Sequence, residues 1–200
     1  VNTTTGYTFA KGLRAILRQD PDVVMVGEMR DVETAQIGIQ SSLTGHLVLS
    51  TVHTNSAVAA IARLRDMGIE SYLLASSLKT IIAQRLVRRL CESCKVSDTP
   101  DTETLAKLGL NSSSKCFKAS GCDDCLDSGY KGRIAIAECL TVDKTIREMI
   151  HNSSSEAAIA DYAFKNNESI DQASKNLITS GITSCDEILR VNNMKEDGSI

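Results

Sequence analysis

Four of the seven cysteines stand in two CxxC pairs, a pattern that is suited to binding a metal ion. Cys91 and Cys94 form the first pair, Cys122 and Cys125 form the second, and residues 95–121 separate them. Each pair offers two thiolates from one tight turn, and four thiolates complete a tetrahedral zinc shell. The pattern predicts structural zinc, although this separation is longer than usual for paired knuckles. Disulfides, which belong to oxidising compartments, and incidental buried thiols are the alternatives.

The remaining three cysteines lie outside both pairs. They are Cys116, Cys139 and Cys185. An unpaired cysteine is most often a small buried hydrophobic residue. We therefore expect all three to be buried in the core.

A carboxylate and an imidazole follow two short apolar runs in the first third of the chain. Val23–Val26 leads into Gly27 and Glu28, and Leu47–Leu49 leads into Ser50, Thr51 and His53. The two runs are bounded by breakers and separated by a helix-length segment, as in buried parallel strands that are joined by a crossover helix. Open α/β sheets bind ligands at the carboxyl ends of their strands. The spacing therefore predicts that Glu28 and His53 share a ligand-binding edge.

Each of these residues also has a structural alternative. Glu28 could be a carboxylate at a helix N-terminus, favoured by the helix dipole, and isolated histidines such as His46 and His53 are most often structural. In P-loop ATPases, a carboxylate at this strand end holds magnesium through water or polarises the attacking water. His53 leaves the same edge, where it could contact a terminal phosphate. The many arginines are typical of solvent-exposed helix surfaces, and their spacing identifies none of them as a catalytic residue.

The surrounding pattern predicts an α/β fold. Helical spacing covers Thr8–Gln19, Asp31–Leu43, Ser56–Met67 and Tyr72–Leu78, and the alternation with strands is typical of a doubly wound sheet. A short apolar stretch follows at 80–83. Residues 91–132 are too polar to build a core unaided. Beyond them we expect a strand at 133–140, helices at 143–151, 155–165, 168–180 and 184–191, and a frayed tail at 192–200.

Composition excludes several classes of function. The chain has 200 residues, 42% of them hydrophobic, and a formal charge of -3, which gives no electrostatic case for nucleic-acid binding. No apolar run approaches the roughly 20 residues that span a bilayer, and no signal peptide is evident. We expect a soluble, cytoplasmic chain. Because it begins at Val1 without a Met, we expect it to be a fragment.

Two long runs carry a resemblance to a known family. LRAILRQDPDVVMVGEMRD and SLTGHLVLSTVHTN resemble the Walker B motif and the histidine box of the secretion ATPase superfamily, the hexameric motors of type II secretion and type IV pilus assembly. The resemblance continues to about Val191. It implies part of a RecA-like P-loop ATPase core over residues 1–90, a four-cysteine zinc-binding subdomain over 91–132, and a strand with a helical C-terminal region over 133–200.

The resemblance also implies roles for individual residues. Glu28 matches the catalytic Walker B acid, and His53 matches the histidine that senses the terminal phosphate. Gly27, Thr51 and, with less weight, His46 match positions near the nucleotide and its magnesium ion. The run GCDDCLDSGYKGRIAIAE resembles the second half of the family's four-cysteine subdomain, which supports structural Zn²⁺. ATP, Mg²⁺, a homo-hexamer and the cytoplasmic domain of a bitopic inner-membrane anchor protein are the implied cofactors and partners, at the cytoplasmic face of the inner membrane.

The main departure from the family is the lack of a phosphate loop. No GxxxxGK[ST] sequence occurs in the 200 residues, and the family's acidic Asp box is missing as well. We therefore expect a C-terminal portion that hydrolyses ATP poorly or not at all by itself. A type IV pilus extension motor is the alternative within the family, and a non-catalytic, zinc-stabilised interaction module is the alternative outside it.

Overall fold

A computed structural model describes residues 8–193 and divides the chain into two compact units. One unit comprises the residues up to Ile81 together with Leu140–Asn166, and the other comprises Ile82–Cys139 together with the residues from Asn167 onward. The chain leaves the first unit within β3 (Thr80–Leu90) and returns within β6 (Tyr130–Thr141). The division at residues 90 and 132 that the sequence indicates stays a prediction.

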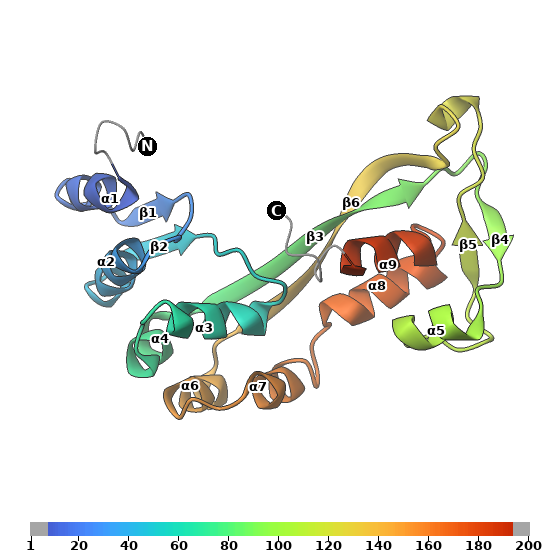
Figure 1. Ribbon diagram of the computed structural model, residues 1–200. Helices are drawn as coiled ribbons and strands as arrows, with labels where there is room; N and C mark the ends of the chain where they lie inside the picture. The colour runs from blue at the N-terminus through green and yellow to red at the C-terminus, as the bar shows by residue number, and fades with distance from the viewer. Residues whose placement is uncertain (1–7, 194–200) are drawn as a thin grey trace. The chain divides into compact units, whose positions relative to one another are not determined.

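The first unit contains the predicted pair of parallel strands. β1 (Val23–Val26) pairs with β2 (Leu47–Ser50), with Val23 opposite Leu47 and Val26 opposite Ser50. The crossover helix α2 (Val32–Leu43) joins them, as Figure 1 shows. Asp31 begins this helix by accepting a hydrogen bond from the Thr34 N–H at 2.8 Å. The predicted strand–helix–strand arrangement and the cap at Asp31 are both confirmed.

Only one face of this small sheet is covered. Val24 and Val26 are buried against Leu13 of α1 (Phe9–Leu17). The opposite face is apolar and about half exposed or more, and it consists of Val23, Met25, Leu47 and Leu49. Parallel sheets are ordinarily covered on both faces. The prediction of fully buried strands is therefore wrong for alternate residues, because no described segment packs on their side.

Four further helices complete the first unit. They are α3 (Ala57–Asp66), α4 (Ser71–Ser77), α6 (Lys144–His151) and α7 (Glu156–Ala163). α3 packs against α7, and α4 packs against α6. Ser56 caps α3 through the Ala59 N–H at 3.1 Å. All four helices follow the sequence prediction in type and approximate position.

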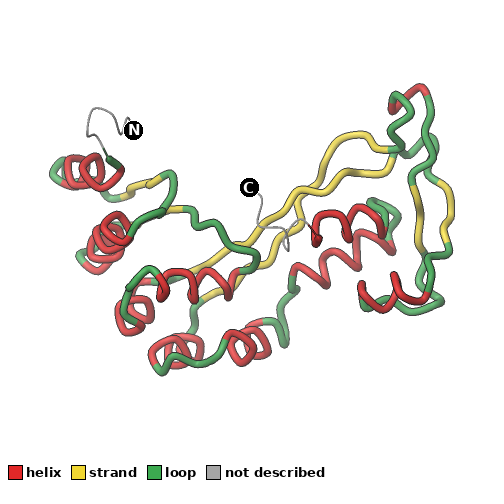
Figure 2. Tube along the Cα trace, in the orientation of Figure 1, coloured by secondary structure: helices red, strands yellow, loops and turns green. Residues whose placement is uncertain are grey.

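The second unit is built on the antiparallel β3–β6 ribbon, the long paired strands of Figure 2. Its other elements are β4 (Val96–Asp98), α5 (Thr102–Leu108), β5 (Cys116–Lys118), a 3₁₀ turn (Asp123–Cys125), α8 (Ile170–Thr179) and α9 (Cys185–Asn193). β4 and β5 form a second antiparallel pair. The apolar stretch that we expected at 80–83 is the start of a strand that continues through Leu90, because pairing with β6 extends it past polar residues.

One hydrophobic cluster holds this unit together. It includes Val87, Leu105, Leu108, Cys116, Ile136, Ile170, Ile178, Cys185 and Ile188. Residues 91–132 contribute only three of its members and pack them against α8 and α9, as expected for a segment that cannot build its own core. Cys116 and Cys185 are buried as predicted. The prediction is wrong for Cys139, which is exposed because it alternates along β6 with the buried Glu138 and Leu140.

Two predictions concern the chain end and the membrane. Asn192 and Asn193 belong to α9 and not to a frayed tail, and the rest of the predicted tail lies outside the described residues. Within residues 8–193, none of the helices has both the length and the apolar character that crossing a membrane requires.

Candidate functional site

The loops that follow β1 and β2 are tied to each other at the carboxyl edge of the sheet. The Thr51 hydroxyl donates to the Gly27 carbonyl at 2.7 Å, and the Met29 N–H donates to the Thr51 carbonyl at 3.0 Å. These two bonds place Glu28 and His53 side by side. The structure therefore brings together Gly27, Glu28, Thr51 and His53 as the strand pattern predicts.

Glu28 is the centre of this edge. Its Oε2 atom accepts a hydrogen bond from Nε of Arg30 at 2.5 Å and lies 3.2 Å from Nε2 of His53. The Glu28 side chain is 17% exposed, against 70% for Arg30 and 80% for His53. The hydrogen bond from Arg30, and after it the one from His53, holds the pKa of Glu28 below its usual value despite partial burial. The site thus presents an ionised carboxylate, which can hold a hydrated cation or orient a water molecule.

Arg30 is the member of this group that sequence reasoning missed. It stands two residues after Glu28 in a loop without helical structure, so both side chains can lie on the same side of the chain. The local sequence Glu-Met-Arg contained this signal, because alternate residues of an extended segment share a face. Only the folded loop shows that Arg30, among the many arginines, reaches the carboxylate.

His46 lies apart from this group. It precedes β2 and therefore stands at the opposite end of the strand from His53. Its Nδ1 lies 3.0 Å from the Ser41 carbonyl oxygen, at the end of α2. The structure does not bring His46 to Glu28, and its contact is that of a residue that shapes the turn between α2 and β2.

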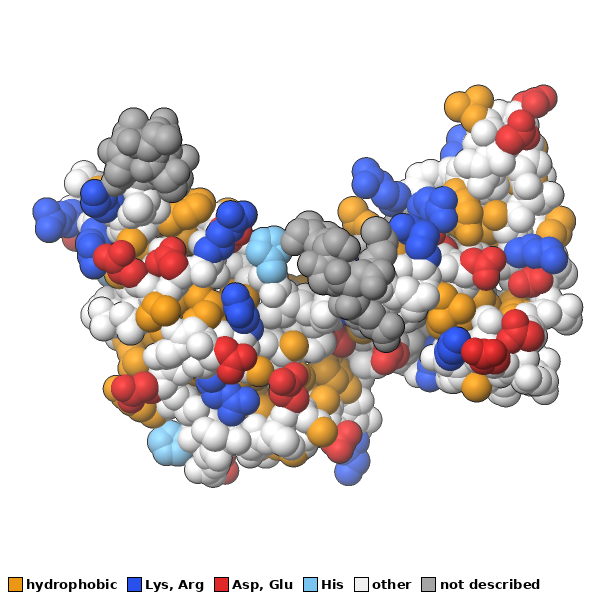
Figure 3. Space-filling view, in the orientation of Figure 1, with side chains coloured by type: hydrophobic (Ala, Val, Ile, Leu, Met, Phe, Trp, Pro, Cys, Tyr) orange, Lys and Arg blue, Asp and Glu red, His pale blue; other side chains and the backbone are white. Residues whose placement is uncertain are grey.

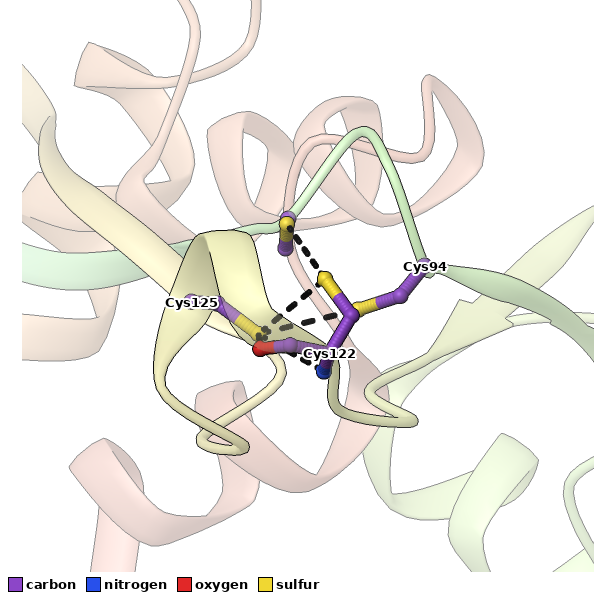
Figure 4. A group of neighbouring side chains, drawn as sticks. Cys94, Cys122 and Cys125 are labelled. Atoms are coloured by element: carbon purple, nitrogen blue, oxygen red, sulfur yellow. Dashed lines mark hydrogen bonds between the residues drawn. The ribbon is translucent and has the colours of Figure 1, made fainter.

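The four paired cysteines form a second site in the other unit. The Sγ–Sγ distances are 3.9 Å for Cys91–Cys122, 3.8 Å for Cys94–Cys125 and 3.7 Å for Cys122–Cys125, and all four sulfurs lie within 4.8 Å of one another. Figure 4 shows the side chains of Cys122 and Cys125, which come from one turn, converging with the side chain of Cys94 from another. A tetrahedral zinc ion with bonds of about 2.3 Å to sulfur needs sulfurs about 3.8 Å apart. The four thiols therefore fit the predicted zinc ion.

Backbone N–H groups surround these sulfurs. Gly121 donates to Cys94 Sγ at 3.3 Å, and Gly129 and Cys122 donate to Cys125 Sγ at 3.2 and 3.3 Å. Burial opposes ionisation of Cys125, but these donors outweigh it and lower its pKa to about 7. Burial and the neighbouring thiols raise the pKa of Cys122 to about 12. A bound metal ion would favour the thiolate form of all four, and the N–H donors would support that form.

Residues beside both cysteine pairs also bind the turn between α8 and α9, within the same unit. Four contacts of 2.7 to 3.0 Å do this: Leu90 N to Ile182 O, Lys95 Nζ to Gly181 O, Thr183 Oγ1 to Arg88 O, and Tyr130 OH to Ser184 Oγ. The cysteine turns and the start of α9 are therefore one connected structure. Nothing in the local sequence of residues 181–184 signals these long-range bonds.

The sequence is similar to known proteins over almost its whole length. Residues 1–190 match the sequence model of the family described as "Type II/IV secretion system protein". The "Type II secretion system protein E" of Dickeya dadantii is 50% identical over 191 residues, which are 96% of this chain and 38% of that protein. The "Type IV pilus assembly ATPase PilB" of Thermus thermophilus is 46% identical over 194 residues, 94% of this chain and 22% of that protein.

A solved structure resembles this chain in fold. The crystal structure of the pilus retraction motor PilT with bound ADP superposes with a TM-score of 0.65 at 26% identity, over 92% of this chain and 43% of that one. The chain thus spans less than half of the type II relative and of the solved motor that it matches.

Proposed function

The chain belongs to the Type II/IV secretion system protein family. From this premise we propose that it is the C-terminal part of a motor that hydrolyses ATP to drive pseudopilus assembly in type II protein secretion. The relative from Dickeya dadantii, at 50% identity, supports the type II assignment. The observation that carries the catalytic proposal is the meeting of Arg30 and His53 on one carboxylate oxygen of Glu28, at the carboxyl edge of a parallel sheet.

Each residue of the edge has a role in this proposal. Glu28 orients the water that attacks the terminal phosphorus, and it would hold a magnesium ion through the water bound to that ion. That ion, when bound, neutralises phosphate charge. His53 is exposed beside Glu28 and contacts the terminal phosphate. Arg30 fixes the Glu28 carboxylate in its ionised state, and Thr51 fixes the backbone at Gly27. Loss of the phosphate would change the charge that His53 faces.

The whole motor needs more than these residues. The sequence contains no GxxxxGK[ST] loop, so the main phosphate cradle would come from protein outside these 200 residues. The wider proposal is a RecA-like core and a homo-hexameric ring in the cytoplasm, at the inner membrane, bound to the secretion platform through a bitopic anchor protein. Family membership supports this part of the proposal.

Two alternatives have their own tests. Assembly of a type IV pilus is favoured by the 46% identity to the Thermus thermophilus pilus ATPase, and complementation of secretion-defective against pilus-defective strains separates the two roles. A non-catalytic zinc module is favoured by the missing phosphate loop. Under either alternative, residues 1–200 alone should show no saturable micromolar binding of magnesium-ATP in calorimetry. Hydrolysis of ATP by the longer protein that is lost in Glu28→Gln would favour the motor over the zinc module.

The role of Arg30 gives a direct test of the catalytic edge. In the longer protein that carries this chain, Arg30→Gln should lower ATP turnover by about tenfold or more, because the Glu28 carboxylate loses its positioning partner. Arg30→Lys should retain part of the rate, since it keeps the charge. Arg147→Gln, on the exposed side of α6, is the control and should hydrolyse at the parental rate. Turnover of Arg30→Gln equal to that of the control would contradict this arrangement.

A further inference from the structure

Met29 stands between the two charged residues that meet at the carboxyl edge of the sheet. Glu28 precedes it, Arg30 follows it, and all three lie in the loop between β1 and α2, which has no helical structure. Because successive residues of an extended segment point to opposite sides, the Met29 side chain leaves the side where Glu28 and Arg30 meet. It is partly buried and lies against α2 at Gly38. The loop therefore presents its charged side chains at the edge and its apolar side chain to the helix.

Gly38 provides the space that the Met29 side chain fills. A Cβ atom at Gly38 would lie 2.6 Å from Cε and 4.0 Å from Sδ of Met29, so a larger residue there would displace the tip of this side chain. Gly38 is buried in the interior of α2, where glycine is ordinarily unfavourable because of its backbone freedom. The same Cβ atom would lie 3.7 Å from Cγ1 of Val48, so β2 borders this space as well. The close approach of Met29 accounts for a glycine at this position.

The backbone of Met29 is fixed as well as its side chain. Its N–H donates to the Thr51 carbonyl at 3.0 Å, and the Thr51 hydroxyl donates to the Gly27 carbonyl at 2.7 Å. Glu28 is thus flanked by two residues whose backbones are bonded to the loop after β2. Met29 adds a side-chain contact with the crossover helix, which these bonds do not supply. At this one residue the loop is held against both β2 and α2.

The charged partners of Glu28 can orient its carboxylate only if the loop itself is fixed. The side chains of Arg30 and His53 are 70% and 80% exposed. Figure 3 shows Lys, Arg and His side chains at the surface near the ends of β1 and β2. Exposed ion pairs contribute little stability, because long side chains lose freedom when they form. The partly buried contact between Met29 and Gly38 is therefore the firmer restraint on the loop.

We propose that Met29 is a positioning residue for the catalytic edge, because by filling the space over Gly38 it holds the loop that directs Glu28 toward Arg30 and His53. Met29 acts through Glu28 and contacts no reacting atom. The inference rests on the proposed ATPase role of Glu28, and it adds to that role an apolar residue outside the hydrogen-bonded group.

Steady-state kinetics of the longer protein that carries this chain test the inference. Met29→Ala removes the atoms that reach Gly38, and we expect kcat to fall about tenfold or more while KM for ATP stays within about twofold. Met29→Leu fills most of the same space and should retain at least about half of the parental kcat. The matched control is Met149→Ala, the same substitution at another partly buried methionine, on α6, and it should keep the parental rate.

Circular dichroism verifies that each variant is folded. If Met29→Ala fails to fold, Met29→Val takes its place with the same expectation, because valine lacks atoms equivalent to Sδ and Cε.

A second measurement shows whether Met29 acts through Glu28. When Met29→Ala is added to Glu28→Gln, we expect a further loss of no more than about twofold, because the carboxylate that Met29 positions is already absent. A residue that only stabilises the fold would lower the rate by the same factor in both backgrounds.

The outcomes separate this inference from the proposed function. Equal rates for Met29→Ala and Met149→Ala, or the same loss from Met29→Ala in both backgrounds, would overturn the positioning role while Glu28→Gln still lacks turnover. Near-parental turnover of Glu28→Gln would overturn the proposed function, and this inference with it.

Discussion

The ammonium group of Lys95 donates a hydrogen bond to the carbonyl oxygen of Gly181 at 3.0 Å. Lys95 directly follows the first CxxC pair, and Gly181 lies in the turn between α8 and α9. The turn is closely packed, because a Cβ atom on Gly181 would lie 2.8 Å from the ring of Phe117. The φ of Gly181 is +68°, a conformation that favours glycine. The first cysteine turn therefore reaches the segment that begins α9.

Removing the Lys95 contact should loosen this turn. In Lys95→Met, we expect faster hydrogen exchange at residues 181–184 and a loss of about 1 kcal/mol in local stability, the usual worth of one hydrogen bond. Lys107→Met, which removes an exposed pair with Glu103, serves as the control and should leave the turn unchanged. Equal exchange in both variants would show that Lys95 does not hold the turn.

The cysteine site should contain one zinc ion per chain. Four sulfurs at mutual distances close to those of a tetrahedral zinc shell motivate this prediction, and metal affinity would then be part of the folding free energy of the unit. Elemental analysis of protein purified without added metal should return about one zinc per chain. Cys91→Ser should increase hydrogen exchange across residues 91–132 and leave β1 unchanged. A fully folded, metal-free preparation would refute the prediction.

Glu187 should make the second unit sensitive to acid. Burial raises the pKa of Glu187, but the hydrogen bonds from Arg190 and Arg88 outweigh it and bring the pKa to about 2, below the ordinary value of 4.5. Because the pKa of the folded state is the lower one, this stabilisation is present above pH 4.5 and is lost as the pH falls toward 2. Glu187→Gln should therefore lower the free energy of unfolding by about 3 kcal/mol at neutral pH and by less at about pH 3. Urea unfolding at both pH values measures this, and a cost that does not change with pH would contradict it.

Local sequence patterns were sufficient to predict the strands and turns whose structure depends on neighbouring residues. Two short apolar runs bounded by breakers identified β1 and β2. Parallel strands present their carboxyl ends at one edge of a sheet, so Glu28 and His53 could be placed together. The CxxC spacing likewise identified the four clustered thiols, because each pair is a single turn.

Contacts between distant segments could not be predicted in this way. β3 continues through polar residues only because β6 pairs with it, and Cys139 is exposed because the strand turns its other face to the core. Arg30 could be told apart from the other arginines only by the loop that aims it at Glu28. Nothing in the local sequence distinguishes Glu187, the buried carboxylate of α9, because its partner Arg88 lies on a distant strand.

The proposed motor depends most directly on Glu28. The decisive measurement compares fluorescent-nucleotide affinity and phosphate release in the longer protein with and without Glu28→Gln. The amide keeps the size and loses the charge, so we predict parental nucleotide affinity with turnover reduced by about 100-fold or more, equivalent to roughly 3 kcal/mol in the barrier. Glu33→Gln, an exposed partner of Arg14, is the control and should leave both quantities unchanged. Phosphate release by Glu28→Gln at near the parental rate would contradict the catalytic role of this sheet edge.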